Sequence, residues 1–198
     1  MNTENNNLDV RQHTLETAQR IISRKGYSAV GLNEILTAAD VPKGSFYYYF
    51  KSKDAFGEAM LQNYFENYLA TMDTIFSAAN QTMAQRLLNY WAHWLDSQES
   101  FDCQGKCLAV KLAAEVADLS EAMRLAIKSG TTGIINRLAD VIDAGVADGS
   151  LNIEADANSL AQTLYQLWLG ASLMAKITRS MDPMKNAMAA TRKILHLE

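Results

Sequence analysis

A chain of 198 residues of which 48% are hydrophobic is long enough for one or two compact domains with buried cores, which excludes an intrinsically disordered protein. Only 2 prolines and 10 glycines occur in it, so helices are favoured almost everywhere and we predict an all-α fold. The net charge is −4, but residues 1–53 carry seven Lys and Arg against five Asp and Glu, whereas residues 54–198 carry 11 against 17. This asymmetry favours a small module for an anionic partner, joined to an acidic body.

The chain contains no segment with the length and apolarity of a membrane span. Its longest apolar stretch, residues 164–175, includes Gln166 and Ser172 and ends at Lys176. The Asn-rich start has neither the charged region nor the apolar run of a secretory signal, and it is expected to fray. We therefore expect a cytoplasmic protein that binds no membrane and whose two cysteines are reduced.

The first two expected helices lie in the basic part of the chain. Apolar residues recur at helical spacing over residues 10–25, and Gly26 follows as a C-terminal stop. A short helix over residues 32–39 comes next, with Gly31 in the capping position. The two residues after this helix are expected to form a tight turn.

A third short helix, KGSFYYYF at residues 43–50, begins after Pro42, which suits the first turn of a helix. Two short helices joined by a tight turn indicate a helix-turn-helix module. The aromatic run divides between two faces of this helix. The core face is predicted to hold Phe46, Tyr49 and Phe50, and the contact face Gly44, Tyr47, Tyr48 and Lys51.

The acidic body begins with a long amphipathic helix that starts at Lys53 and is capped by Ser52. Further helices bring the total to about nine. They are expected from Thr82 to Gln98, from Lys106 or Cys107 to Ala117, from Ser120 to Ala147, from Asp156 to Arg179 and from Pro183 to Leu195. Large side chains of the body are chiefly core, although some of them can line a ligand pocket: Tyr90, Trp91, Trp94, Met123, Tyr165, Trp168 and Met174.

The segment GLNEILTAADVPKGSFYYYFKSKDAF resembles the DNA-binding head of the TetR family of bacterial transcriptional repressors. The family pattern Tyr-x-Tyr-Phe-x-x-Lys is matched by Tyr47, Tyr49, Phe50 and Lys53. The resemblance implies a helix-turn-helix DNA-binding domain at residues 1–53 and an effector-sensing and dimerisation domain at residues 54–198. It further implies a homodimer that binds a palindromic double-stranded operator. Gly31 departs from the family, which has Ser or Thr there as a contact to phosphate.

Several residues of the third helix are the ones that a major groove would meet. Gly44 lets the backbone come close, and Lys43 offers a donor to guanine or phosphate. Lys53 adds its charge to a helix N-terminus, which makes a phosphate clamp. The expected DNA-contact residues are Lys43, Gly44, Ser45, Tyr47, Tyr48 and Lys53. The alternative is a solvated basic face on an ordinary helical protein.

Two blocks of the body, GKCLAVKLAAEVADLSEAMR and YQLWLGASLMAKITRS, resemble the N-ethylmaleimide reductase repressor subgroup of this family. That subgroup responds to electrophiles and oxidants. The resemblance also implies that the last two long helices pair with their copies in a second chain as a four-helix dimer core. The small residues Gly170, Ala171 and Ala175 would allow a close approach of helices there.

The two cysteines, Cys103 and Cys107, have no histidine or second cysteine pair near them in sequence, so no zinc site and no cofactor are expected. Both can be small apolar fillers. Cys107 is also a candidate sensor, because it opens an expected helix and has two lysines close by in sequence. Cys103 is a weaker candidate. Lys176 either extends its ammonium to solvent or, as its place in the subgroup block implies, lies near Cys107 and stabilises the thiolate or reacts with its oxidised form.

Two rival functions remain open. The first is an all-α enzyme with Cys107 as nucleophile, although no His or Asp stands at a spacing that indicates a base, and GTTG at residues 130–133 is not a phosphate loop. The second is a repressor that responds to a reversible apolar ligand and never uses its thiols.

Overall fold

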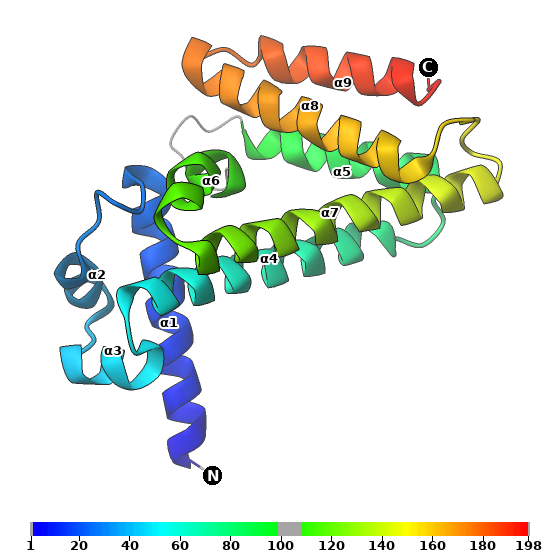
Figure 1. Cartoon of the computed structure of the whole chain (residues 1–198). Coiled ribbons are helices and arrows are strands. Elements are labelled where there is room, and N and C mark those ends of the chain that lie inside the picture. The colour runs from blue at the N-terminus through cyan, green and yellow to red at the C-terminus, as the bar shows by residue number, and fades with distance from the viewer. Residues whose placement is uncertain (1, 99–107, 198) are drawn as a thin grey trace. The chain divides into compact units, whose positions relative to one another are not determined.

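The computed structural model describes residues 2–98 and 108–197, with side chains from Asp9 onward. These residues form nine helices and no strand, which confirms the predicted all-α fold (Figure 1). The helices are α1 (Asn2–Lys25), α2 (Leu32–Ala39), α3 (Lys43–Phe50), α4 (Lys53–Phe76), α5 (Met83–Ser97), α6 (Leu108–Leu119), α7 (Glu121–Ala147), α8 (Ala157–Thr178) and α9 (Asp182–Ile194). Among the helices described, none is long and apolar enough to cross a membrane.

Side-chain caps set four of the helix starts, those of α4, α5, α7 and α8. The Ser52 hydroxyl accepts from the amide of Ala55 at 3.0 Å, and the Asp156 carboxylate accepts from that of Ser159 at 2.8 Å. α1 differs, because it begins at Asn2, so the prediction of a frayed start is wrong. Once a helix is nucleated, each further residue adds a backbone hydrogen bond, even through polar sequence.

The described chain divides into two compact units. The first holds the described residues within 1–67 and 102–130, and the second those within 68–101 and 131–198. Helices α4 and α7 contribute residues to both units. These units are defined by packing, whereas the predicted boundary at residues 53 and 54 separates functions and stays a prediction.

An aromatic cluster forms the core of the first unit beneath α3. The ring centroids of Phe46 and Phe50 are 5.2 Å apart, and Phe56 of α4 lies 4.9 Å from Phe50. Phe46 and Phe50 are buried, as predicted, whereas Tyr49 is only half-buried. Pro42 precedes α3 as its N-cap instead of occupying its first turn. The buried cluster therefore holds one face of α3 against α4.

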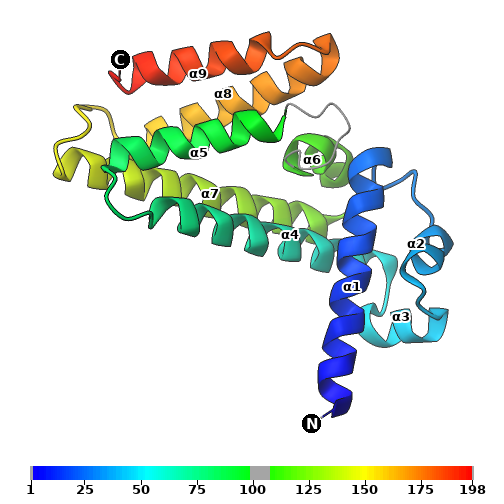
Figure 2. The same cartoon turned by 180° about the vertical axis from the view of Figure 1, so that it is seen from behind.

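In the second unit α8 packs against α9, and α9 also contacts α5 (Figure 2). Trp91 of α5 stacks on Trp168 of α8, with centroids 4.8 Å apart. The indole of Trp168 donates to Thr191 at 2.9 Å, and that of Trp94 donates to Ser172 at 3.1 Å. The predicted aromatic core is thus present. Met174 was expected in this core, but it is 46% exposed because it lies on the opposite face of α8.

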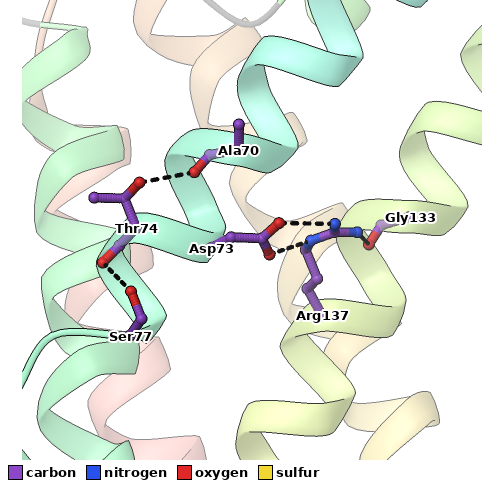
Figure 3. A network of polar contacts seen from close by, with 6 residues as sticks. All are labelled: Ala70, Asp73, Thr74, Ser77, Gly133 and Arg137. Atoms are coloured by element: carbon purple, nitrogen blue, oxygen red, sulfur yellow. Dashed lines mark hydrogen bonds and ion pairs between the residues drawn. The ribbon is translucent and has the colours of Figure 1, made fainter.

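Helices α4 and α7 approach each other closely within each unit. In the first unit, a Cβ on Gly130 would overlap the ring of Phe65. In the second unit, Arg137 of α7 donates to both carboxylate oxygens of Asp73 of α4, at 2.6 and 3.0 Å (Figure 3). The GTTG segment therefore serves helix packing, because Gly133 likewise faces Leu69.

Candidate nucleic-acid interface

The turn between α2 and α3 has the geometry expected of a helix-turn-helix. Asp40 ends α2 in the left-handed conformation, with φ 53°, which Asp tolerates better than most residues. The amide of Val41 then donates to the carbonyl of Leu36 at 3.0 Å and closes the turn. Val41 is buried, so the turn places α3 directly after α2 without a flexible link.

The outer face of α3 is open to a partner. Tyr48 is 75% exposed and Tyr47 is 44% exposed, although both belong to a residue type that is usually more buried. Lys43 and Gly44 are exposed at the start of the helix, and a Cβ on Gly44 would meet nothing within 4 Å. Ser45 is half-buried. This face combines hydrogen-bond donors, two aromatic rings and a bare stretch of backbone.

The half-buried side chain of Lys53 makes contacts within the protein that its position in the sequence did not predict. Its ammonium donates to the carbonyl of Val30 at 2.7 Å and lies 4.8 Å from the ring centroid of Tyr27. The hydroxyl of Tyr27 in turn donates to the carbonyl of Lys53 at 2.7 Å. One ammonium N–H is therefore used by Val30, and the predicted phosphate contact stays a prediction.

Tyr27 is a residue that the sequence did not single out. It is 6% exposed and lies against α4 at Gly57, where a Cβ would come within 2.8 Å of the phenol oxygen. Burial, with a smaller contribution from the carboxylate of Asp54, raises the pKa of Tyr27 to about 12. A tyrosine after the helix-ending Gly26 gave no sequence signal, because its partners are distant along the chain.

Glu115 of α6 binds the same loop from another side. Its carboxylate accepts from the amides of Ser28 at 2.6 Å and Tyr27 at 3.1 Å. Burial alone would raise the pKa of Glu115, but these hydrogen bonds and the nearby Lys111 ammonium outweigh it, so the pKa is lowered. Lys111 also donates to the carbonyl of Arg24, near the end of α1, at 3.2 Å. α6 therefore satisfies backbone groups in the last turn of α1 and in the loop that follows it.

Of the three predicted sensor residues, the structure describes only Lys176. Cys103 and Cys107 lie outside the described residues, as does the predicted start of α6 at Lys106 or Cys107. The amide of Leu108, which follows Cys107, donates to the hydroxyl of Tyr64 on α4 at 3.1 Å. Lys176 is exposed in the last turn of α8.

Two family models match this chain. Residues 15–60 match the model described as bacterial regulatory proteins, tetR family. Residues 84–191 match the model described as tetracyclin repressor-like, C-terminal domain. The first match includes α2, α3 and the turn between them.

Individual proteins resemble the chain over most of its length. It is 40% identical over 187 residues to the HTH-type transcriptional repressor NemR of Escherichia coli strain K12, with 94% of each chain covered. It is 34% identical to the HTH-type transcriptional repressor DhaR of Mycobacterium sp. strain GP1, over 88% of this chain and 86% of that protein. A crystal structure of the reduced form of E. coli NemR matches with a TM-score of 0.90, covering 94% of this chain and 97% of that one.

Proposed function

The chain belongs to the TetR family of bacterial regulatory proteins, and from that premise we propose that it is a homodimeric repressor that an electrophile or oxidant releases from a palindromic DNA operator. Its relatives are transcriptional repressors and not enzymes, so the chain is a repressor and not the thiol-dependent enzyme considered from the sequence. The proposal has three parts, which are DNA contact, dimerisation and release.

DNA contact rests on one observation, which is the division of α3 into two faces. Phe46 and Phe50 anchor the helix in the core, while Tyr47 and Tyr48 project outward. A helix held in this way can enter the major groove, where hydroxyl groups and lysines read base edges and phosphates. We assign the groove contacts to Lys43, Gly44, Ser45, Tyr47 and Tyr48.

Dimerisation is assigned to the outer face of α8 together with α9. Leu173, Met174 and Ile177 are 48%, 46% and 65% exposed, and they are neighbours on one face of the helix. An apolar face of this kind is unfavourable in water unless a partner covers it. A second copy of the chain is the partner that the family resemblance and a symmetric operator both require.

Release is assigned to Cys107, with Cys103 as a secondary thiol. Cys107 directly precedes Leu108, the first described residue of α6, and a helix N-terminus favours the reactive thiolate. The solved relative is described as a reduced form of NemR, which supports a redox-sensitive group in this branch of the family. Lys176 either assists the thiolate or only contacts solvent.

A reversible apolar ligand is the second candidate signal. The indole nitrogen of Trp91 is buried in the aromatic core of the second unit, and it has no hydrogen-bond partner among the residues that the structure describes. A buried donor of this kind would gain from a ligand that carries a hydrogen-bond acceptor.

The DNA-binding part is tested by incubating the purified full chain with random-sequence duplexes at low salt and sequencing those retained. We expect enrichment of palindromes whose half-sites are separated by about one helical turn, roughly 34–36 Å, or a modest multiple of it. A pool that remains random after repeated rounds would contradict the proposed function. A variant with Tyr47 and Tyr48 both changed to Ala is the matched control and should retain no sequence selectively.

A further inference from the structure

Arg11 carries a positive charge on the side of α1 that otherwise packs in the core. Leu15, Ala18 and Ile22 are 0% exposed on this side, and Arg11 lies on it about one helical turn before Leu15. The spacing predicts another apolar residue there, whereas the structure has a half-buried arginine. Removing a guanidinium partly from water costs free energy unless a partner replaces the lost hydration. Arg11 is therefore expected to have a partner that compensates for its burial.

The partner that the structure provides is an aromatic ring. The guanidinium carbon of Arg11 lies 5.4 Å from the ring centroid of Phe50, the last residue of α3. Phe50 is 3% exposed and its ring lies 4.9 Å from that of Phe56, so it gives the guanidinium a fixed support. The ring attracts the positive charge but offers no oxygen to the five N–H donors of the guanidinium. The compensation is therefore incomplete.

No carboxylate within the described part of the chain completes this compensation. The ion pairs between the described side chains involve other cations. Arg11 also donates no side-chain hydrogen bond to the residues that the structure describes. Lys51, which directly follows Phe50, is exposed and likewise belongs to none of these ion pairs. Two positive charges without a paired carboxylate therefore stand at the C-terminal end of α3, where they attract an anion.

Arg11 lies at one end of the helix that is proposed to enter the major groove. The first turns of α1 extend past α3 in both views (Figures 1 and 2). Lys43 is the first residue of α3, so Lys43 and Arg11 place a cation at each end of this helix. The exposed rings of Tyr47 and Tyr48 lie between the two ends. A recognition helix in the major groove has a phosphate backbone on each side of it, so cations at its ends can meet phosphates.

We propose that Arg11 binds a backbone phosphate of the operator, so that the DNA-contact surface extends from α3 onto α1. The inference rests on the proposed function, because it presupposes that the chain binds DNA. A guanidinium fits a phosphate well, since its planar fork donates two parallel hydrogen bonds. The Phe50 ring holds this fork in place before DNA arrives, which lowers the entropy cost of binding. Arg11 reads no base and strengthens binding to every sequence alike.

The test measures the affinity of the full-length protein for a duplex recovered by the random-sequence selection, at salt concentrations from about 50 to 200 mM. Arg11→Met keeps a long apolar side chain over Phe50 but removes the charge. Its salt slope should flatten by about one unit, so that its loss of affinity relative to the wild type shrinks about three- to fourfold over this range. Arg11→Lys should bind more weakly than the wild type but keep its slope, because it retains the charge and loses the fork.

Arg20→Met is the matched control, because it removes the same charge from the same helix. Arg20 is exposed, donates to the hydroxyl of Thr17 at 3.0 Å, and lies nine residues after Arg11, which places it about 180° around α1. Its salt slope should equal that of the wild type. An equal flattening in Arg11→Met and Arg20→Met would show only a general effect of net charge and would overturn the inference.

The rival role for Arg11 is purely structural, since a cation also stabilises the C-terminal end of a helix. In that case Arg11→Met would lower the midpoint of thermal unfolding and weaken binding at a slope parallel to that of the wild type. A parallel slope, or wild-type affinity, contradicts the inference. Arg11→Gln gives the same comparison of slopes if Arg11→Met does not fold. A wild-type protein that binds no duplex contradicts the proposed function instead, so the two failures are distinct.

Discussion

The hydroxyl of Tyr27 donates to the backbone carbonyl of Lys53 at 2.7 Å, while the Lys53 ammonium lies 4.8 Å from the centroid of the Tyr27 ring. Each residue thus binds the other through a different group. The pair joins the loop after α1 to the first turn of α4. The carboxylate of Glu115 of α6 accepts hydrogen bonds from two backbone amides of the same loop. Three helices therefore meet at one short loop, which lies directly before the helix-turn-helix.

Tyr27→Phe should lower the free energy of unfolding by about 1 kcal/mol at neutral pH, because one buried hydrogen bond is lost. The folded-state pKa of Tyr27 is raised from 10.0 to about 12, so ionisation is easier in the unfolded chain. The stability from this group is complete below pH 10.0 and disappears as pH rises towards 12. Denaturant unfolding should show that the difference in free energy of unfolding between wild type and variant becomes smaller over this pH range. The exposed Tyr48→Phe should show neither effect.

Glu115→Gln should destabilise the protein by about 1 kcal/mol at neutral pH, because an amide offers one acceptor oxygen and no charge to the loop. The pKa of Glu115 is lowered below 4.5 in the folded state, so its contribution is present above 4.5 and is lost as pH falls through the folded value. Urea unfolding from neutral to acid pH measures this difference. Asp118→Asn, an exposed change on the same helix, is the control. An equal effect of both changes at every pH would contradict the assigned role of Glu115.

Ile177→Asp should convert the protein to monomers and weaken binding to a palindromic duplex. Ile177 is 65% exposed in the single chain, so the change should alter the stability of the monomer by no more than about 0.5 kcal/mol. In a dimer it would bury an unpaired carboxylate. Light scattering gives the mass, with Leu125→Asp, 46% exposed on α7, as the control. A dimeric Ile177→Asp protein would exclude this face as the interface.

Truncation of the chain before Asp156 tests dimerisation less clearly than the single change Ile177→Asp does. α8 supplies Trp168 and Tyr165 to the core of the second unit, and α9 supplies Thr191. Removing both helices would expose Trp91 and Trp94, so that loss of the dimer could not be separated from loss of the fold. Single changes on the exposed face of α8 avoid this ambiguity.

Cys107→Ser should bind DNA as the wild type does but resist release by N-ethylmaleimide. In the wild type, the thiolate sulfur adds to one carbon of the maleimide double bond, and the other carbon then takes a proton from water. Cys103→Ser should still be released. Lys176→Met should blunt release if the lysine assists the thiolate. A DNA-release titration with thiol mass mapping measures all four proteins.

If Cys107→Ser is released as readily as the wild type, the sensor assignment is wrong. A reversible ligand near Trp91 then becomes the better account of induction. Trp91→Phe, which removes the buried indole N–H and keeps an aromatic ring, would be the next variant to measure. Its response to a panel of apolar compounds should differ from that of the wild type.

The sequence by itself determined the helices, their caps and the two faces of α3. Ser52 caps a helix as predicted, and Phe46 and Phe50 are buried, because capping and helical periodicity depend on residues a few positions apart. Only the tertiary structure decided the partners of Lys53 and the role of Glu115, which binds a loop 87 and 88 residues away. Such contacts depend on how helices dock, and docking is set by side-chain shape across the whole core instead of by any local pattern.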